Sequence, residues 1–133
     1  MAYDEALANA FRSRIAGIEG VSERKMMGGV CFFLGGNMLG GADRQASGAG
    51  RFMFRVGKPN DAVAAVLPGG APIVQGGRRL TGMYFVDEDE CTDDVFRQWL
   101  SLALSYASTL PEKPPAPPKP RKPSRARTRA ANR

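Results

Sequence analysis

The fold is decided by the stretch Val30-Cys31-Phe32-Phe33-Leu34-Gly35-Gly36-Asn37-Met38-Leu39. Its two apolar runs flank a Gly-Gly-Asn sequence, which favours a tight turn because glycine and asparagine tolerate positive φ angles. The continuous apolar run before the turn is typical of a buried strand. The stretch therefore predicts a β-hairpin.

A further strand is predicted over residues 51–56, where the side chains alternate in character. Successive residues of a strand point to opposite faces, so one face is apolar and the other carries cations. The apolar face holds Phe52, Phe54 and Val56, and the other face holds Arg51 and Arg55. This is the pattern of a half-buried strand.

The links around this strand give two more signals. Residues 43–50 hold no large apolar side chain and predict a mobile loop. A second hairpin is expected where Ile73-Val74 and residues 80–86 flank a Gly76-Gly77 turn.

Three helices complete the expected elements. The first is capped by Asp4 and has apolar residues three and four positions apart, at Leu7, Phe11, Ile15 and Ile18. A short helix is expected from its cap, Asn60, to Leu67. A long helix begins after its cap, Thr92, ends at Pro111, and has the apolar face Val95, Phe96, Trp99, Ala103, Tyr106 and Leu110.

The order is helix, three strands, helix, two strands, helix. Strands grouped between helices and joined by hairpin-length links predict an α+β domain, with an antiparallel sheet and helices on one face in two layers. Charge separates this domain, residues 1–110, from residues 111–133. The first part carries 11 basic and 12 acidic residues, whereas the second carries eight basic residues, one acid and seven of the ten prolines. A segment so rich in proline and cations predicts an extended, disordered tail.

Composition excludes several classes of function. The chain has no histidine, which excludes Ser-His-Asp and Cys-His catalysis and most zinc sites. Its cysteines, Cys31 and Cys91, lie in no metal or redox spacing, as is typical of a reduced cytoplasmic protein. We find no signal-peptide core and no apolar run of the roughly 18–20 residues that span a bilayer. We expect no cofactor and no membrane partner.

Other candidate sites have simpler interpretations. The Gly-Gly pairs at residues 28–29, 35–36, 40–41 and 76–77 fit neither phosphate-binding motif. The acidic run Asp87 to Glu90 is followed by Cys91 and Thr92, where a calcium loop needs Asp or Asn and then glycine. A basic strip on the outer sheet face could contact phosphates or be an ordinary solvated surface: Arg51, Arg55, Lys58, Arg78 and Arg79. A small-molecule enzyme would need a pocket gathering Arg55, an acid and Cys31 or Tyr84.

Residues 3–112 contain an ordered set of short motifs: Lys25-Met26-Met27-Gly28-Gly29, Gly36-Asn37-Met38, Phe54-Arg55-Val56-Gly57, Arg79-Leu80-Thr81-Gly82, and the helix that holds Trp99. This set resembles the TfoX/Sxy N-terminal domain family. Its motif residues, to which we assign structural roles, are Lys25, Met26, Gly28, Gly29, Gly36, Asn37, Arg55, Gly57 and Gly82. The chain departs from the family at Met27, which replaces a phenylalanine, in a longer loop over residues 43–50, and in having a basic tail instead of a second domain.

The resemblance implies a fold like that of secretion chaperones and a regulatory, non-enzymatic role. Full-length relatives look like activators of competence genes that act beside a DNA-bound transcription factor. A protein partner of this kind, or a homodimer, is therefore expected. No catalytic residues come with the family.

The tail adds a second expectation, non-specific nucleic-acid affinity. Its cations are spaced along the segment as Lys119, Arg121, Lys122, Arg125, Arg127, Arg129 and Arg133. Such charges contact a phosphate backbone without reading its sequence. Two alternatives stay open: the prolines make the tail a ligand for a partner's aromatic groove, or the tail serves solubility alone.

Overall fold

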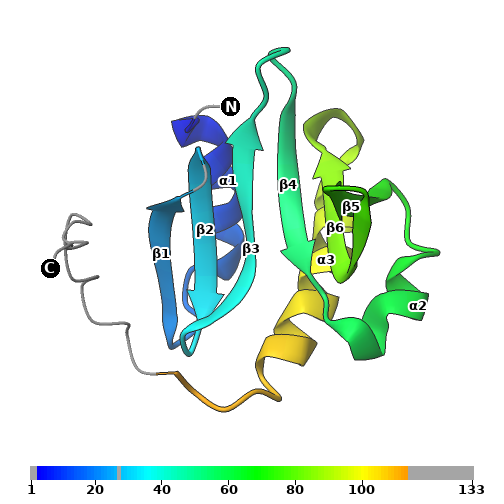
Figure 1. Ribbon diagram of the computed structural model, residues 1–133. Helices are drawn as coiled ribbons and strands as arrows, with labels where there is room; N and C mark the ends of the chain where they lie inside the picture. Colours follow the sequence, from blue (N-terminus) through cyan, green and yellow to red (C-terminus); the bar gives the residue numbers. More distant parts are fainter. Residues whose placement is uncertain (1–2, 27, 114–133) are drawn as a thin grey trace, which may run out of the picture.

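The computed structural model describes residues 3–26 and 28–113 and shows an α+β fold (Figure 1). The elements in chain order are α1 (Glu5–Ile15), β1 (Val21–Met26), β2 (Gly29–Leu34), β3 (Asn37–Arg44), β4 (Gly50–Arg55), the 3-10 turn η1 (Lys58–Asn60), α2 (Asp61–Ala64), β5 (Gly70–Gln75), β6 (Arg78–Asp87), the 3-10 turn η2 (Glu88–Glu90) and α3 (Asp93–Ala107).

The strands form one six-stranded sheet in the order β1-β2-β3-β4-β6-β5, and every neighbouring pair is antiparallel. Helices α1 and α3 lie behind the sheet in Figure 1, so one face is covered and the other is open. This arrangement confirms the expected α+β fold with an antiparallel sheet and helices on one face. Both predicted hairpins are also present, as β2–β3 and β5–β6.

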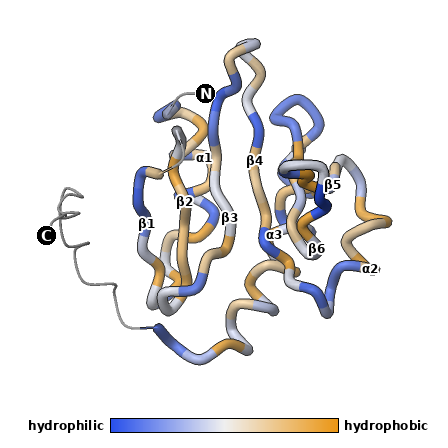
Figure 2. The backbone as a smooth tube through the Cα atoms, in the orientation of Figure 1, coloured by the Kyte–Doolittle hydropathy of each residue, from blue (hydrophilic) through white to orange (hydrophobic). Residues whose placement is uncertain are grey.

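Strand β1 was not predicted, and four strands rather than three precede α2. Its sequence, Val-Ser-Glu-Arg-Lys-Met, is polar at its four central positions, as the blue colour of β1 beside the orange of β2 shows in Figure 2. An edge strand has one neighbour and can carry charge on both faces, so it lacks the alternating pattern by which strands are found. Pairing with the apolar β2 nevertheless fixes its register, with Arg24 opposite Cys31.

The predicted loop over residues 43–50 was wrong in extent. Strand β3 continues to Arg44, and β4 begins at Gly50. The glycines of β3 explain why no apolar pattern marks it: a Cβ atom on Gly40 would lie 2.0 Å from the Met53 carbonyl oxygen. Backbones therefore approach closely where a larger side chain would collide.

The short helix was also predicted too long, and its expected cap is wrong. Asn60 makes no side-chain capping bond to α2; instead its amide nitrogen donates to the carbonyl oxygens of Val56 at 3.0 Å and Leu102 at 3.4 Å. It thus ties the link after β4 to α3. The other two capping predictions are confirmed, because Asp4 accepts from the Leu7 backbone N–H and Thr92 from that of Val95.

The core lies between the sheet and the two long helices and is mainly aromatic. Phe11 of α1 stacks on Phe32 with ring centroids 4.5 Å apart. Phe96 of α3 packs edge-on against Phe54, which also contacts Phe11 and Trp99. All five of these rings are less than 2% exposed. Offset and edge-to-face pairs of this kind add to the free energy that burial itself supplies.

Candidate interaction surface

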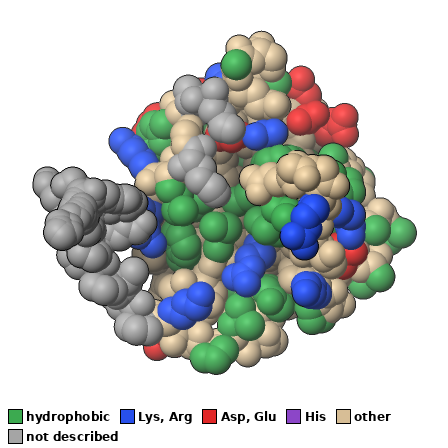
Figure 3. All heavy atoms as spheres, in the orientation of Figure 1, with side chains coloured by type: hydrophobic (Ala, Val, Ile, Leu, Met, Phe, Trp, Pro, Cys, Tyr) green, Lys and Arg blue, Asp and Glu red, His purple; other side chains and the backbone are tan. Residues whose placement is uncertain are grey.

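The open face of the sheet is apolar at its centre, although none of the helices in the described part of the chain covers it. On β4 the alternation that buries Phe52 and Phe54 sends Met53 outward, and on β6 it sends Met83 and Phe85 outward. Figure 3 shows apolar side chains gathered in the middle of this face, with lysine and arginine side chains around them. A contiguous apolar patch rimmed by polar groups is the usual mark of an interaction site.

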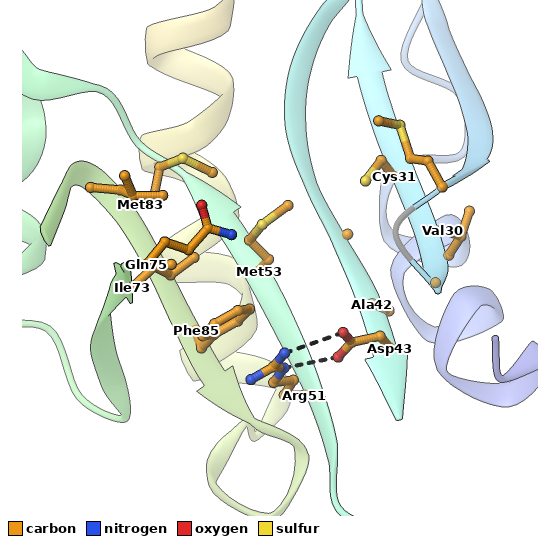
Figure 4. A pocket seen from close by; sticks show the side chains of 14 residues that line it. Val30, Cys31, Ala42, Asp43, Arg51, Met53, Ile73, Gln75, Met83 and Phe85 are labelled. Atoms are coloured by element: carbon orange, nitrogen blue, oxygen red, sulfur yellow. Dashed lines mark hydrogen bonds and ion pairs between the residues drawn. The ribbon is translucent and has the colours of Figure 1, made fainter. Parts of the chain in front are cut away.

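The patch is hollowed into a groove of about 310 Å³ that crosses the sheet from β1 to β5. Its apolar walls are Met26, Met53, Ile73, Leu80, Met83 and Phe85. Figure 4 shows Cys31 of β2 and Met53 of β4 projecting on the two sides of β3. Three of the chain's six methionines therefore lie in one groove.

The floor of the groove is bare backbone at two glycines. A Cβ atom on Gly29 would lie 2.4 Å from the Ala42 carbonyl oxygen, and one on Gly41 would lie 2.4 Å from that of Val30. Both distances are far below van der Waals contact, so β2 and β3 require glycine at these positions. The hollow is therefore a consequence of how closely the strands pack.

Cys31 lies in the floor and is 4% exposed. Burial raises the pKa of its thiol, and the carboxylate of Asp43 raises it further. The thiol form is not the nucleophile, so Cys31 serves here as a small apolar side chain. Tyr84 is buried against Trp99 on the opposite face of the sheet. The groove that holds Cys31 and Asp43 is not lined by Arg55, so it lacks the set of Arg55, an acid and Cys31 or Tyr84 that a small-molecule site would need.

An ion pair closes one end of the groove. The Arg51 Nε atom is 2.9 Å from Asp43 Oδ1, and the Arg51 guanidinium lies 3.7 Å from the centre of the Phe85 ring (Figure 4). Arg51 is thereby neutralised and held in place. The second acid of this end, Asp87, is opposite Arg51 in the β4–β6 register.

The basic strip expected from the sequence is divided by such pairing. Arg79 is bound to Asp61, at 2.9 Å, and Lys58 lies in η1. Three other arginines remain around the groove without an ion pair to a described carboxylate: Arg24, opposite Cys31; Arg55, opposite Met83; and Arg78, opposite Gln75. The rim is therefore cationic away from the Arg51 end.

The family-motif residues fall in separate places rather than in one site. Met26 and Gly29 belong to the groove, and Gly28 takes a positive φ of 78° in the link between β1 and β2. The Lys25 ammonium group lies 4.5 Å from the centre of the Tyr3 ring. This part of the motif forms the β1–β2 hairpin and one wall of the groove.

Gly36 and Asn37 hold the segment that follows α3. The Asn37 side chain, 3% exposed, donates from Nδ2 to the Pro111 carbonyl oxygen at 3.0 Å, and the Lys113 backbone N–H donates to the Gly35 carbonyl oxygen at 2.7 Å. A Cβ atom on Gly36 would lie 2.4 Å from the Lys113 carbonyl oxygen. Residues 111–113 therefore pack against the β2–β3 turn, past the boundary expected at residue 110.

Gly57 and Gly82 form a third contact, between the link after β4 and strand β6. Both have positive φ angles, and the Val56 and Gly57 backbone N–H groups donate to the Gly82 carbonyl oxygen. Arg55 lies beside them, 5.2 Å from the centre of the Tyr106 ring. These motif residues thus have structural roles in this fold.

A polar cluster missed by sequence reasoning lies next to Gly82. Asp61 Oδ1 accepts hydrogen bonds from Arg79, Tyr84 and the Gly82 backbone N–H, each at 2.9 Å. The Arg79 hydrogen bond lowers the pKa of Asp61, and burial followed by the Asp61 bond raises that of Tyr84. No local pattern marks this cluster, because Asp61 and Tyr84 are 23 residues apart.

One feature of the sequence pointed to the groove, namely apolar residues at outward positions of β4 and β6. Met53 is an apolar residue at an outward position of an alternating strand, and residues 80–86 are apolar at outward and inward positions alike. Apolar residues on both faces are typical of a strand covered on both sides. The proposed nucleic-acid contacts, in contrast, lie outside the described residues: Lys119, Arg121, Lys122, Arg125, Arg127, Arg129 and Arg133.

These features define an α+β domain with one helix-covered sheet face and one open, grooved face. The chain belongs to the TfoX N-terminal domain family, whose model matches residues 13–107. This membership confirms the resemblance drawn from the ordered motifs. No curated protein matches the chain, and neither does any solved structure.

Two further observations concern the part of the chain that the structure describes. Its Cys, Asp and Glu side chains form no group of three or more that is placed to hold a metal ion. Its helices also lack the length and apolar character needed to cross a bilayer.

Proposed function

We propose that this chain is a non-enzymatic regulatory adaptor. Its folded domain binds a protein partner through the open sheet face, and its basic segment holds nucleic acid without sequence preference. The observation that carries the proposal is the grooved apolar surface on the sheet face opposite α1 and α3, which no helix of residues 3–26 and 28–113 covers. Membership of the TfoX N-terminal domain family supports a role in transcription or competence.

The position of the basic segment supports the division of roles. Residues 111–113 are fixed to the β2–β3 turn by Asn37 and Gly35, at the end of the sheet in Figure 1. The twenty residues that follow carry seven cations and no acid. These cations therefore follow a segment that is fixed to the domain, and they add an electrostatic contact with nucleic acid to whatever the folded domain binds.

Duplex-DNA binding by three full-length proteins tests this proposal. The first is the natural chain. The second has all seven cations of residues 119–133 replaced by glutamine, and the third keeps these cations but has serine at Pro114, Pro115, Pro117, Pro118, Pro120 and Pro123. We expect the natural chain and the serine variant to bind with a salt slope of up to about −6, and the glutamine variant to lose that binding.

Equal DNA affinity of the natural and glutamine proteins would refute the nucleic-acid role of the basic segment. Loss of binding in the serine variant alone would show that the prolines matter more than the charge. The alternative, in which the proline-rich segment is itself a ligand for a partner protein, predicts instead that the serine variant loses partner binding. The folded domain is identical in all three proteins, so it is the constant against which the segment is compared.

A further inference from the structure

We propose that the groove on the open sheet face binds an amphipathic helix of a partner protein, with the apolar side of the helix in the groove and carboxylates along its flanks. This inference rests on the proposed adaptor function and names the chemistry of the partner. It combines three properties of the groove: its methionine walls, its glycine floor and its cationic rim.

The walls suit apolar side chains of varied shape. Met26, Met53 and Met83 come from three different strands and face the same hollow. Methionine is unbranched and polarisable, so it adapts to irregular partners, and surfaces rich in it bind amphipathic helices. Phe85 adds the flat apolar surface of its ring. The Arg51 guanidinium, 3.7 Å from the centre of that ring, holds it in place.

The floor suits a long, convex ligand. Gly29 and Gly41 lie on neighbouring strands and leave bare backbone between higher side chains on β1 and β4. A row of helix side chains can enter such a trough. The same sheet already packs two helices, α1 and α3, on its other face. A partner helix would add a third layer, an arrangement that sheets in α/β domains commonly adopt.

The rim selects the charge of the partner. Arg24, Arg55 and Arg78 surround the groove and make no ion pair with a described carboxylate, whereas Asp43 is bound to Arg51. Carboxylates on both flanks of a helix would complement these arginines. The same charges disfavour the chain's own residues 114–133, which carry seven cations and no acid, and they disfavour the same face of a second copy.

The probe is a labelled synthetic peptide of about 18 residues, roughly five helical turns, made of leucine, alanine and glutamate with the leucines three and four apart. Two control peptides replace every glutamate by lysine or every leucine by serine. Binding to the full-length protein is followed by fluorescence anisotropy. We expect the glutamate–leucine peptide to bind at least about tenfold more tightly than either control.

Variants of the protein show where on its surface the peptide binds. Met53→Gln removes a wall of the groove without a change of charge, and Met38→Gln makes the same change on β3 outside the groove. The double variant Arg24→Glu, Arg78→Glu reverses the rim, and Arg97→Glu changes the charge of α3 on the far side of the sheet. We expect Met53→Gln and the rim variant each to weaken binding by about tenfold, with both controls unchanged.

Equal binding by the natural protein and Met53→Gln would overturn the proposal, because the basic segment is intact in both and would then be the site. Tighter binding of the lysine peptide would refute the role of the rim. A protein found dimeric by sedimentation, and made monomeric by Met53→Gln, would assign the groove to a second copy and overturn the proposal as well. None of these results depends on DNA binding, so the adaptor proposal is judged separately.

Discussion

The two faces of the sheet are packed differently, and two consecutive residues of strand β4 show the difference. Phe54 points into a covered layer of rings that contact one another at defined angles, and it is fully buried. Met53 points into an open groove among other methionines. The covered face has a fixed set of partners and can be packed for stability, whereas the open face is built of side chains that adapt. Because successive side chains of a strand point to opposite faces, Phe54 contributes to stability and Met53 is available for the proposed recognition.

The largest expected effect separates these two residues directly. Phe54→Ala should lower the free energy of unfolding by about 3–5 kcal/mol, because it leaves a cavity among Phe11, Phe96 and Trp99. Met53→Ala should cost about 1 kcal/mol or less, since its side chain is half-buried and borders solvent. Urea unfolding followed by the fluorescence of Trp99, the single tryptophan, measures both. Similar costs for the two variants would remove the distinction between the faces.

A second substitution tests a position on the open face where a larger residue should destabilise the fold. Gly41→Ala adds a methyl group that would meet the Val30 carbonyl oxygen at 2.4 Å, so the strands must move apart. We expect a loss of about 1–3 kcal/mol, the range typical of overpacking. Gly41 has no positive φ angle, and the cost therefore reports crowding alone. If Gly41→Ala unfolded at the same urea concentration as the natural protein, the glycine floor would not be required by the packing of the strands.

The smallest expected effect is a pH dependence that belongs to the covered face. Asp4 caps α1 and Asp61 joins α2 to β6, and the hydrogen bonds they accept hold both pKa values below the ordinary 3.8. At acid pH the unfolded chain binds protons more readily than the folded one, so this stabilisation is present above about pH 4 and is lost as the pH falls below that value. Urea midpoints measured between pH 6 and pH 3, values that bracket an ordinary carboxyl pKa, should fall. The fall should be smaller in Asp61→Asn, and an unchanged pH dependence in that variant would contradict the role of Asp61.

The covered face was largely predictable from sequence and the open face was not. Apolar residues recur at every second position of β4, as Phe52 and Phe54, and at every fourth position of α1 from Leu7 to Ile15. The sequence therefore shows which face of each element is buried. Asp4 and Thr92 precede their helices and act as caps, as expected. The Gly-Gly pairs at residues 35–36 and 76–77 placed the turns of the two predicted hairpins. Each of these features depends on residues close together in the chain.

The remaining features depend on contacts that no local pattern records. The groove joins Met26 to Met83 across five strands, and the Asp61–Tyr84 bond joins residues 23 positions apart. Strand β1 was missed because its pairing, not its composition, makes it a strand. Asn60 was expected to cap α2, but tertiary contacts with Val56 and Leu102 take its side chain. Long-range partners override local preference at such positions.

The central claim is that one molecule binds nucleic acid and a protein helix at separate places. The direct test attaches duplex DNA to a surface, adds the full-length protein, and then measures binding of the labelled glutamate–leucine peptide to the DNA-bound protein. The account predicts that the peptide binds with the same affinity as in solution and leaves the DNA complex intact. Release of the protein from DNA as the peptide is added would contradict it, because the two ligands would then share the cationic segment.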